Sequence, residues 1–121
     1  MTDHSLTNQP VLAYLGPAGT FTEQALYDQT DLLDHILTPT ASIPEVLRMV
    51  SDGQANLGFV AIENSIEGSV NITQDTLTFD TNLLIQREVV NGIELNLLTP
   101  TGVGLGDVEM VLSFPHAIAQ C

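Results

Sequence analysis

The sequence predicts an α/β fold with a mainly parallel sheet and helices on both faces. Short apolar runs end in glycine, proline or polar residues, helix signals follow three of these runs, and the two kinds of segment alternate along the chain. Such alternation is typical of parallel strands joined by helices. In these sheets, ligands bind at the carboxyl ends of the strands. A chain of 121 residues can bury one hydrophobic core.

The first strand and helix are expected directly after a flexible tail, residues 1–10. The run Val11–Leu15 is apolar and is closed by the glycine and proline turn of residues 16–20, which favours a buried strand. A helix is expected from Thr20 to Leu33. Thr20 is a suitable N-cap, and Glu23, three residues later, completes a capping box.

A second strand and helix follow the same pattern. The strand is expected near Ile36 to Thr38, and Ser42 can cap the next helix with Glu45 at the capping-box position. Pro44 suits the first helical turn, and Gly53 ends the helix.

The remaining elements are predicted from shorter signals. A third strand is expected over Leu57–Ile62, and a helix or partial helix from Ser69 to Leu77. The Asn91-Gly92 dipeptide indicates either a tight hairpin turn or a bend in one long strand. The later expectations are strands over 83–90, 93–99 and 108–115, a flexible glycine-rich loop over 101–107, and a helix from residue 115 or 116 to the last residue.

The charge of the chain limits its partners. Fifteen acidic residues face two basic ones, Arg48 and Arg87, which gives a net charge of −13. Nucleic acid and anionic membrane surfaces both need clustered Lys or Arg, so neither is expected as a partner. The same charge poses a question for any anionic substrate.

Location and metal content are judged from what the sequence lacks. Cys121 is the only cysteine, which suits a reducing compartment, and the polar N-terminus has neither the basic nor the apolar region of a signal peptide. No apolar run is long enough for a membrane span, so the expected location is the cytoplasm. His4 and His35 have no companions at metal-ligand spacing, so no metal site is expected.

Three strand ends carry small or polar residues and are expected to meet at one rim. Gly19 and Thr20 lie where a glycine turn enters a helix, which can bind an anion through backbone N–H groups and the hydroxyl. The alternative is an ordinary capped helix after a tight turn.

The second strand end carries Glu63, Asn64 and Ser65. The amide and hydroxyl can donate neutral hydrogen bonds to a carboxylate, while Glu63 can hold them in place or act as an acid or base. Alternatively, Asn64 and Ser65 cap the next helix and Glu63 is solvated. Gly68 and Thr73 add a further spot where the backbone can approach a ligand closely.

The third strand end is Ser113, followed by a proline-initiated helix that carries Gln120 about one and a half turns later. His116 is a possible general acid or base, although an isolated histidine at a helix start is more often structural or solvated. The final helix stops after barely two turns on the apolar sequence AIAQC. We therefore expect the chain to be the N-terminal piece of a longer protein.

The segments YLGPAGTFTEQA, GFVAIENSIEGSVNITQDTL and SFPHAIAQC, in this order and spacing, resemble prephenate dehydratase over essentially Val11–Cys121. The resemblance implies conversion of prephenate to phenylpyruvate, water and carbon dioxide in L-phenylalanine biosynthesis, without metal or organic cofactor. It implies a two-lobed fold similar to type 2 periplasmic binding proteins, with substrate in the cleft. Residues 11–90 would then form the first lobe, and 91–121 the crossover and the start of the second.

The resemblance also assigns residues to the cleft. The family's substrate-lining positions correspond to Gly19, Thr20, Asn64, Ser65, Ser113 and Gln120. The family pattern departs here at two places, since Phe114 replaces the usual histidine and His116 the usual glutamine. The family's Thr-Arg-Phe motif is not in this chain, and its threonine is the favoured proton donor.

The missing motif implies that the fragment is inactive alone, and it answers the charge question. The rest of the enzyme would supply the cationic contacts, while this part supplies neutral donors. The resemblance further implies a homo-oligomer and feedback by L-phenylalanine at a downstream ACT domain. The alternatives are arogenate dehydratase, a non-catalytic small-anion-binding lobe of the same fold, and an α/β interaction module whose motifs are only helix caps.

Overall fold

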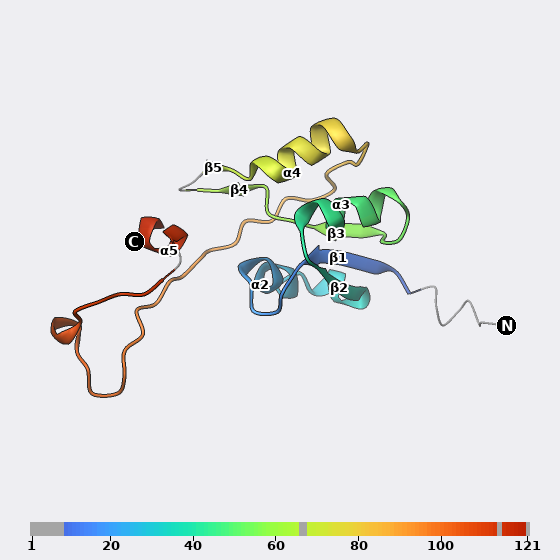
Figure 1. Ribbon diagram of the computed structural model, residues 1–121. Helices are drawn as coiled ribbons and strands as arrows, with labels where there is room; N and C mark the ends of the chain where they lie inside the picture. The colour runs from blue at the N-terminus through green and yellow to red at the C-terminus, as the bar shows by residue number, and fades with distance from the viewer. Residues whose placement is uncertain (1–8, 66–67, 114, 121) are drawn as a thin grey trace. The chain divides into compact units, whose positions relative to one another are not determined.

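A three-stranded parallel sheet organises the first part of the chain (Figure 1). The computed structural model describes residues 9–65, 68–113 and 115–120, and for residues 116, 119 and 120 it describes the backbone only. In chain order the elements are β1 (Val11–Leu15), α2 (Phe21–Tyr27), the 3₁₀ helix η1 (Thr30–Asp34), β2 (Ile36–Thr40), α3 (Ile43–Ser51), β3 (Leu57–Phe59), β4 (Glu63–Asn64), β5 (Gly68–Ser69), α4 (Asn71–Asp75), the π-helical η2 (Thr76–Asp80), the 3₁₀ helix η3 (Leu105–Asp107) and α5 (Pro115–Gln120).

The strands lie in the order β2-β1-β3, and both neighbours run parallel to β1. Leu12 pairs with Leu37 on one side and with Leu57 on the other, so β1 is the central strand. The predicted α/β architecture with a parallel sheet is therefore confirmed. The second strand is longer than expected and continues through Pro39 to Thr40. Pro39 is tolerated because β2 is an edge strand, where one N–H has no ladder partner to lose.

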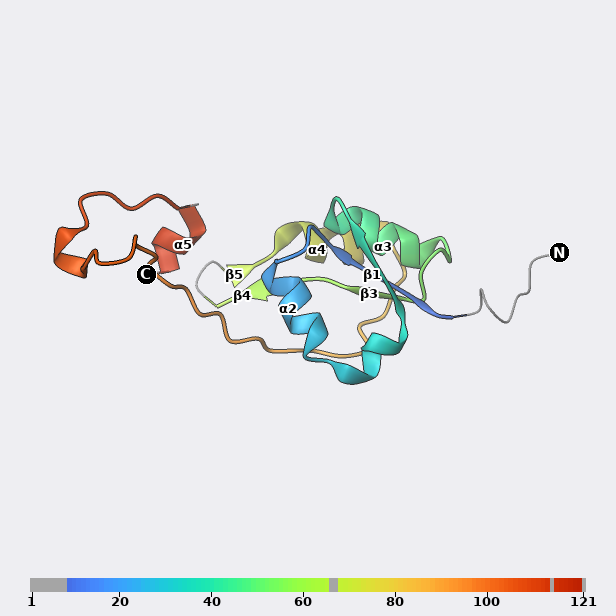
Figure 2. The same cartoon turned by 90° about the horizontal axis from the view of Figure 1, so that it is seen from below.

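The core is divided between the two faces of β1. Leu12 and Tyr14 pack with Leu26 of α2, while Ala13 packs with Val46 of α3 and with Ala55. Successive side chains of a strand point to opposite faces, so one five-residue strand contributes to both clusters. Figures 1 and 2 show α2 and α3 on opposite sides of the sheet, which confirms the predicted coverage of both faces.

Both predicted helix caps are present. The side chain of Thr20 accepts a hydrogen bond from the backbone N–H of Glu23, and that of Ser42 accepts one from Glu45. Gly53 follows α3 with a φ of 81°, a conformation that favours glycine at a helix end. The first helix is shorter than predicted, because α2 ends at Tyr27 and the tighter η1 replaces its last turns.

The predicted third strand is wrong in its second half. The ladder with β1 ends at Phe59, and Glu63–Asn64 pair instead with Gly68–Ser69 in a two-stranded antiparallel ribbon. The following helix begins at Asn71 with Val70 at its N-cap and no side-chain cap. Asn64 and Ser65 are therefore not the caps of this helix, which removes the alternative reading of these two residues.

The strands predicted over 83–90, 93–99 and 108–115 are also wrong. Between residues 81 and 113 the structure assigns only a turn and η3, and Asn91-Gly92 joins no pair of strands. A strand needs a neighbour for its backbone hydrogen bonds, and no neighbour is assigned to these residues. The helix expected at the end of the chain is present as α5.

Contacts divide the chain into two units, Met1–Asn91 and Gly92–Cys121. The first unit contains every buried residue that the structure describes, and the described residues of the second unit include none. At the start of the first unit, the last two residues of the predicted tail are held in place, because Gln9 donates a hydrogen bond to the Asp34 carbonyl and Pro10 accepts one from Ile36. Residues 1–8 lie outside the described part of the chain.

Replacing Gly58 by alanine is expected to destabilise the first unit by about 1–3 kcal/mol, because it overpacks the contact of β3 with α3. A Cβ there would lie 2.9 Å from Val46 Cγ1 and 3.2 Å from Val50 Cγ2. The measurement is urea unfolding. Gly92→Ala is the control, because its Cβ would meet no atom within 4 Å. Equal unfolding midpoints for the two variants would contradict the packing described here.

Candidate functional site

Two of the three predicted site segments leave the sheet at the same edge. The turn of residues 16–20 follows β1, and the segment leading to Glu63 follows β3, which runs parallel to β1. The backbone N–H of Gly16 donates to the Thr40 carbonyl at 2.9 Å, which ties the turn to the end of β2 as well. All three strand ends therefore lie on one edge, where parallel sheets bind their ligands.

The glycine turn has a requirement that the sequence pattern did not reveal. Gly19 has a φ of 89°, and a Cβ there would meet no atom within 4 Å, so backbone conformation rather than space favours glycine. Its N–H donates to Glu23 Oε1 at 3.0 Å. The Gly19 N–H, predicted to bind an anion, is therefore already bound to a carboxylate of the protein itself.

Glu23 is buried between this turn and the sheet. Its second oxygen, Oε2, accepts a 2.8 Å hydrogen bond from the Tyr14 hydroxyl, and its side chain is 9% exposed. The capping-box spacing identified Glu23, but that pattern places its carboxylate on the N-cap N–H, one residue further on. The sequence signal that could have revealed the position of the carboxylate was Tyr14, a tyrosine in an otherwise apolar strand, because a buried hydroxyl needs a hydrogen-bond partner.

The hydroxyl of Thr20 can still donate a hydrogen bond to a ligand. Its Oγ1 accepts from the Glu23 N–H at 3.2 Å, and a hydroxyl that accepts in this way still has its own hydrogen to donate. The side chain is half-buried at the edge of the sheet.

The β4–β5 ribbon presents the second candidate segment. Asn64 pairs with Gly68 and is half-buried, while Glu63 and Ser65 are exposed. Gly68 has a φ of 83°, which favours glycine at the start of β5. The backbone of this ribbon is thus fixed by its own pairing, and its polar side chains are those expected of a neutral donor site.

Thr73 anchors this ribbon to α4. The residue is fully buried, and its hydroxyl donates to the Ala61 carbonyl at 2.7 Å. The N–H of Val70 donates to the Ile62 carbonyl at 2.9 Å, just beyond the ribbon. Thr73 is therefore built into the protein as a support for the segment that carries Glu63 and Asn64.

The third candidate segment belongs to the second unit. Ser113 is exposed, and Gln120 is the last residue of α5. The side chains of His116 and Gln120, and all of Phe114 and Cys121, lie outside the described part of the structure. The structure therefore brings the first two segments to one sheet edge, and the third is described within its own unit.

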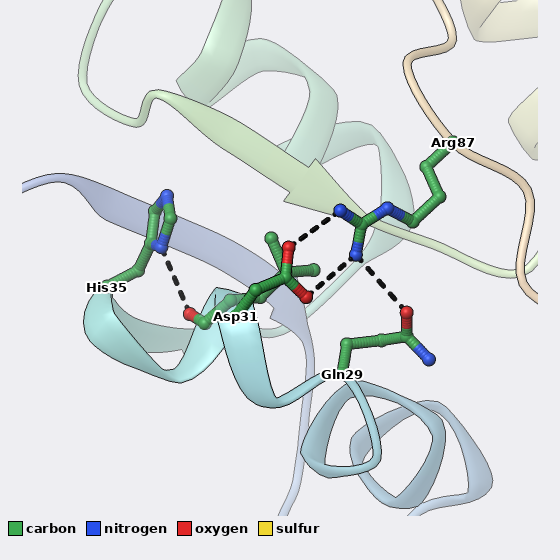
Figure 3. A network of polar contacts seen from close by, with 5 residues as sticks. Gln29, Asp31, His35 and Arg87 are labelled. Carbon is green, nitrogen blue, oxygen red and sulfur yellow. Dashed lines mark hydrogen bonds and ion pairs between the residues drawn. The ribbon is translucent and has the colours of Figure 1, made fainter.

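Both arginines lie beside acidic side chains of the protein itself. Arg87 makes two hydrogen bonds to the carboxylate of Asp31, at 2.7 and 3.0 Å, and one to Gln29 at 3.2 Å (Figure 3). The hydrogen bonds from Arg87 lower the pKa of Asp31, and those to Asp31 raise the pKa of Arg87. Arg48 lines a polar hollow of about 220 Å³ between α3 and η2, together with residues such as Asp52 and Asp80.

Neither a metal-binding cluster nor a membrane-spanning helix is present among the described residues. They contain no group of three or more His, Cys, Asp or Glu side chains placed to hold a metal ion. None of the helices among them is both long enough and apolar enough to cross a membrane.

The stability of the chain is expected to fall as the pH rises from about 10 to about 12. Burial, together with the hydrogen bond to Glu23, raises the pKa of Tyr14 to about 12. The unfolded chain loses the phenolic proton near pH 10, so in this window the folded state holds more protons and unfolding becomes easier as pH rises. Urea unfolding at several alkaline pH values measures the slope. Tyr14→Phe should have a shallower slope, and an equal slope would exclude Tyr14 as its source.

The chain was compared with known proteins. Residues 12–121 match the family described as prephenate dehydratase. A prephenate dehydratase from Mycobacterium leprae is 39% identical over 117 residues, covering 90% of this chain and 36% of the relative. One from Amycolatopsis methanolica is 38% identical over 109 residues, covering 90% of this chain and 35% of the relative.

A solved prephenate dehydratase from Streptococcus mutans has a similar fold, with a TM-score of 0.54 and 36% identity over 60% of this chain and 37% of that one. This likeness confirms the expected periplasmic-binding-protein-like fold class. The chain spans about a third of the length of the curated relatives it matches.

Proposed function

Because the chain belongs to the prephenate dehydratase family, we propose that it forms part of the catalytic domain of an enzyme that converts prephenate to phenylpyruvate, water and carbon dioxide. The observation that carries the proposal is the match over residues 12–121, which includes all three candidate segments. We use the term complete enzyme for a prephenate dehydratase that has the length of these relatives and contains this chain.

Residues 11–90 are proposed to form the first lobe, and residues 91–121 the crossover and the start of the second. The division of the chain into units ending and beginning at Asn91 and Gly92 supports this boundary. It also agrees with the position of the buried core, which lies entirely before the boundary among the described residues.

The proposed role of this part of the enzyme is to orient the substrate. Asn64 and Ser65 from the ribbon and Thr20 from the turn offer neutral donors on one sheet edge. Gly19 contributes the backbone shape of the turn, since its N–H is bound to Glu23. The remaining proposed residues are Ser113 and Gln120 as substrate contacts, with Glu63, Gly68 and Thr73 as supports.

The net charge of the chain supports the proposal that this part of the enzyme contacts the substrate through neutral donors. Prephenate has two carboxylates, and the chain has a net charge of −13 with Arg87 committed to Asp31. Neutral donors can contact an anion without adding charge, while the attractive cations and the proton donor are proposed to come from the rest of the complete enzyme.

The reaction requires few chemical steps from the protein. Loss of the ring carboxylate and the hydroxyl creates an aromatic ring, so the driving force lies in the substrate. The enzyme must hold both leaving groups in position and protonate the hydroxyl. Amide and hydroxyl side chains such as those of Asn64 and Ser65 suit the first task, because they do not change protonation at neutral pH.

The complete enzyme is further proposed to act in the cytoplasm as a homo-oligomer, with L-phenylalanine as its feedback effector. The proposal follows from membership of the family.

The test of the proposed function is product formation by the complete enzyme from prephenate and, separately, from arogenate. We expect kcat/KM to be higher for prephenate. A higher value for arogenate would make the enzyme an arogenate dehydratase. Tight binding of a phenylpyruvate-like anion without turnover of either substrate would instead indicate a non-catalytic lobe.

A further inference from the structure

Glu23 contacts both residues of the glycine turn that are proposed to belong to the substrate edge. Its carboxylate oxygen Oε1 accepts a hydrogen bond from the Gly19 N–H at 3.0 Å, and its backbone N–H donates to Thr20 Oγ1 at 3.2 Å. Because the second bond uses the hydroxyl as an acceptor, the hydroxyl hydrogen stays available for a group outside the helix. Glu23 therefore holds the turn with its side chain and its backbone at once.

Tyr14 fixes the same carboxylate from the central strand of the sheet. Its hydroxyl donates to the other oxygen, Oε2, at 2.8 Å, and both side chains are buried. Burial and the contact with Glu23 raise the pKa of Tyr14 to about 12, so the phenol keeps its proton at neutral pH and remains a donor. The turn is thereby tied to β1, the strand that has a neighbour on each side.

Capping of a helix does not by itself require a buried carboxylate. At the start of α3, Glu45 has the same position relative to its cap residue, and its carboxylate accepts from the Ala41 N–H at 3.1 Å. That hydrogen bond lies exposed to solvent. Removing a carboxylate from water costs free energy that an exposed cap avoids. The burial of Glu23 is therefore explained by its hold on the turn rather than by the capping of α2.

We propose that Glu23 is a positioning residue, which acts through Gly19 and Thr20 and sets the place of the Thr20 hydroxyl at the substrate edge. Gly19 has a φ of 89°, and a Cβ there would meet no atom within 4 Å. Neighbouring atoms therefore do not confine the turn at Gly19, and the hydrogen bond to Glu23 does. The inference rests on the proposed function only in taking Thr20 as a substrate contact.

The test is a double-mutant cycle in the complete enzyme, measured as kcat/KM for prephenate. Glu23→Met removes the carboxylate, keeps the backbone N–H that binds Thr20 and leaves a good helix former in place. We expect kcat/KM to fall by about tenfold or more, because a small displacement of an orienting group has an effect of this size. In a Thr20→Ala background the same change should lower kcat/KM by less than about twofold, since the hydroxyl that it misplaces is absent.

Matched variants separate positioning from a loss of folded protein. Glu45→Met removes the corresponding carboxylate of α3 and should leave kcat/KM unchanged. Glu23→Gln keeps one acceptor oxygen, so its kcat/KM should lie between those of the native enzyme and Glu23→Met. Circular dichroism establishes that each variant is folded. If Glu23→Met does not fold, Tyr14→Phe takes its place in the cycle, because it removes the donor to Oε2, and its smaller loss of kcat/KM should also vanish in the Thr20→Ala background.

The outcomes distinguish this inference from the proposed function. Equal losses of kcat/KM with and without the Thr20 hydroxyl, or a folded Glu23→Met enzyme as active as the native one, would overturn the positioning role and leave the proposed function intact. If the native enzyme does not turn over prephenate, the proposed function fails, and the cycle is then measured as the Kd of phenylpyruvate. Weaker binding in Glu23→Met that depends on Thr20 would support the positioning role. Binding that is unchanged, or absent in the native enzyme as well, would overturn it.

Discussion

Replacing Asn64 by alanine in the complete enzyme is expected to lower kcat/KM for prephenate by about tenfold or more. The side chain is presented from β4, whose backbone pairs with β5, so the ribbon should persist without the amide. The loss is that of one hydrogen bond to a charged substrate, about 1–3 kcal/mol. Steady-state kinetics with prephenate measures the effect.

The control for this prediction is Asn82→Ala. Asn82 is exposed and lies outside every strand and helix, so its replacement should leave kcat/KM unchanged. If Asn64→Ala is as active as this control, Asn64 does not belong to the substrate site.

Replacing Glu23 by glutamine is expected to destabilise the chain by about 1.5–3 kcal/mol. The carboxylate accepts from Gly19 N on one oxygen and from the Tyr14 hydroxyl on the other. The amide retains only one acceptor oxygen, so its NH₂ group faces one of these two donors at a buried position. Urea unfolding at neutral pH measures the loss.

The comparison with Glu45→Gln isolates the effect of burial. Glu45 also follows a cap residue and also accepts from a backbone N–H, that of Ala41, but at the exposed start of α3. Its replacement should cost less than about 0.5 kcal/mol. A double-mutant cycle of Glu23→Gln with Tyr14→Phe should show coupling between the two side chains. A cost of Glu23→Gln no larger than that of Glu45→Gln would show that the buried bridge contributes nothing to stability.

The helix caps and the central strand were predictable because each is set by a few residues that are close together in the sequence. Thr20 and Ser42 were identified as caps because a hydroxyl followed three residues later by a glutamate satisfies the first turn of a helix wherever it occurs. The run Val11–Leu15 was identified as a buried strand because it is short, apolar and closed by glycine and proline. The structure covers both of its faces, which is why the run is apolar at successive positions.

The predictions that were wrong concern strands, and a strand forms only where a partner strand lies beside it. Residues 83–90, 93–99 and 108–115 have strand-like patterns, but a pattern does not say whether a partner strand is present. Residues 60–62 continue an apolar run, yet the ladder with β1 stops at Phe59 and the chain turns into the β4–β5 ribbon. Periodicity alone cannot show where one sheet ends and another begins.

The candidate site was predictable in its residue types but not in its contacts. Small and polar residues after strands indicated a ligand edge, and the structure places the first two segments there. The sequence did not show that Glu23 binds the Gly19 N–H, since that bond depends on a carboxylate buried against Tyr14. Nor did it show that Thr73 is a buried support, because a hydroxyl in a short helix has the same sequence signal whether it is inside or outside.

The most direct test of the account is phenylpyruvate formation from prephenate, followed by absorbance at alkaline pH, for this 121-residue chain beside the complete enzyme. We expect product from the complete enzyme and none from the chain, because the chain contributes orienting donors without the proposed proton donor. Product from the chain alone would mean that a residue such as Glu63 carries out the acid chemistry, which would contradict the division of roles proposed here.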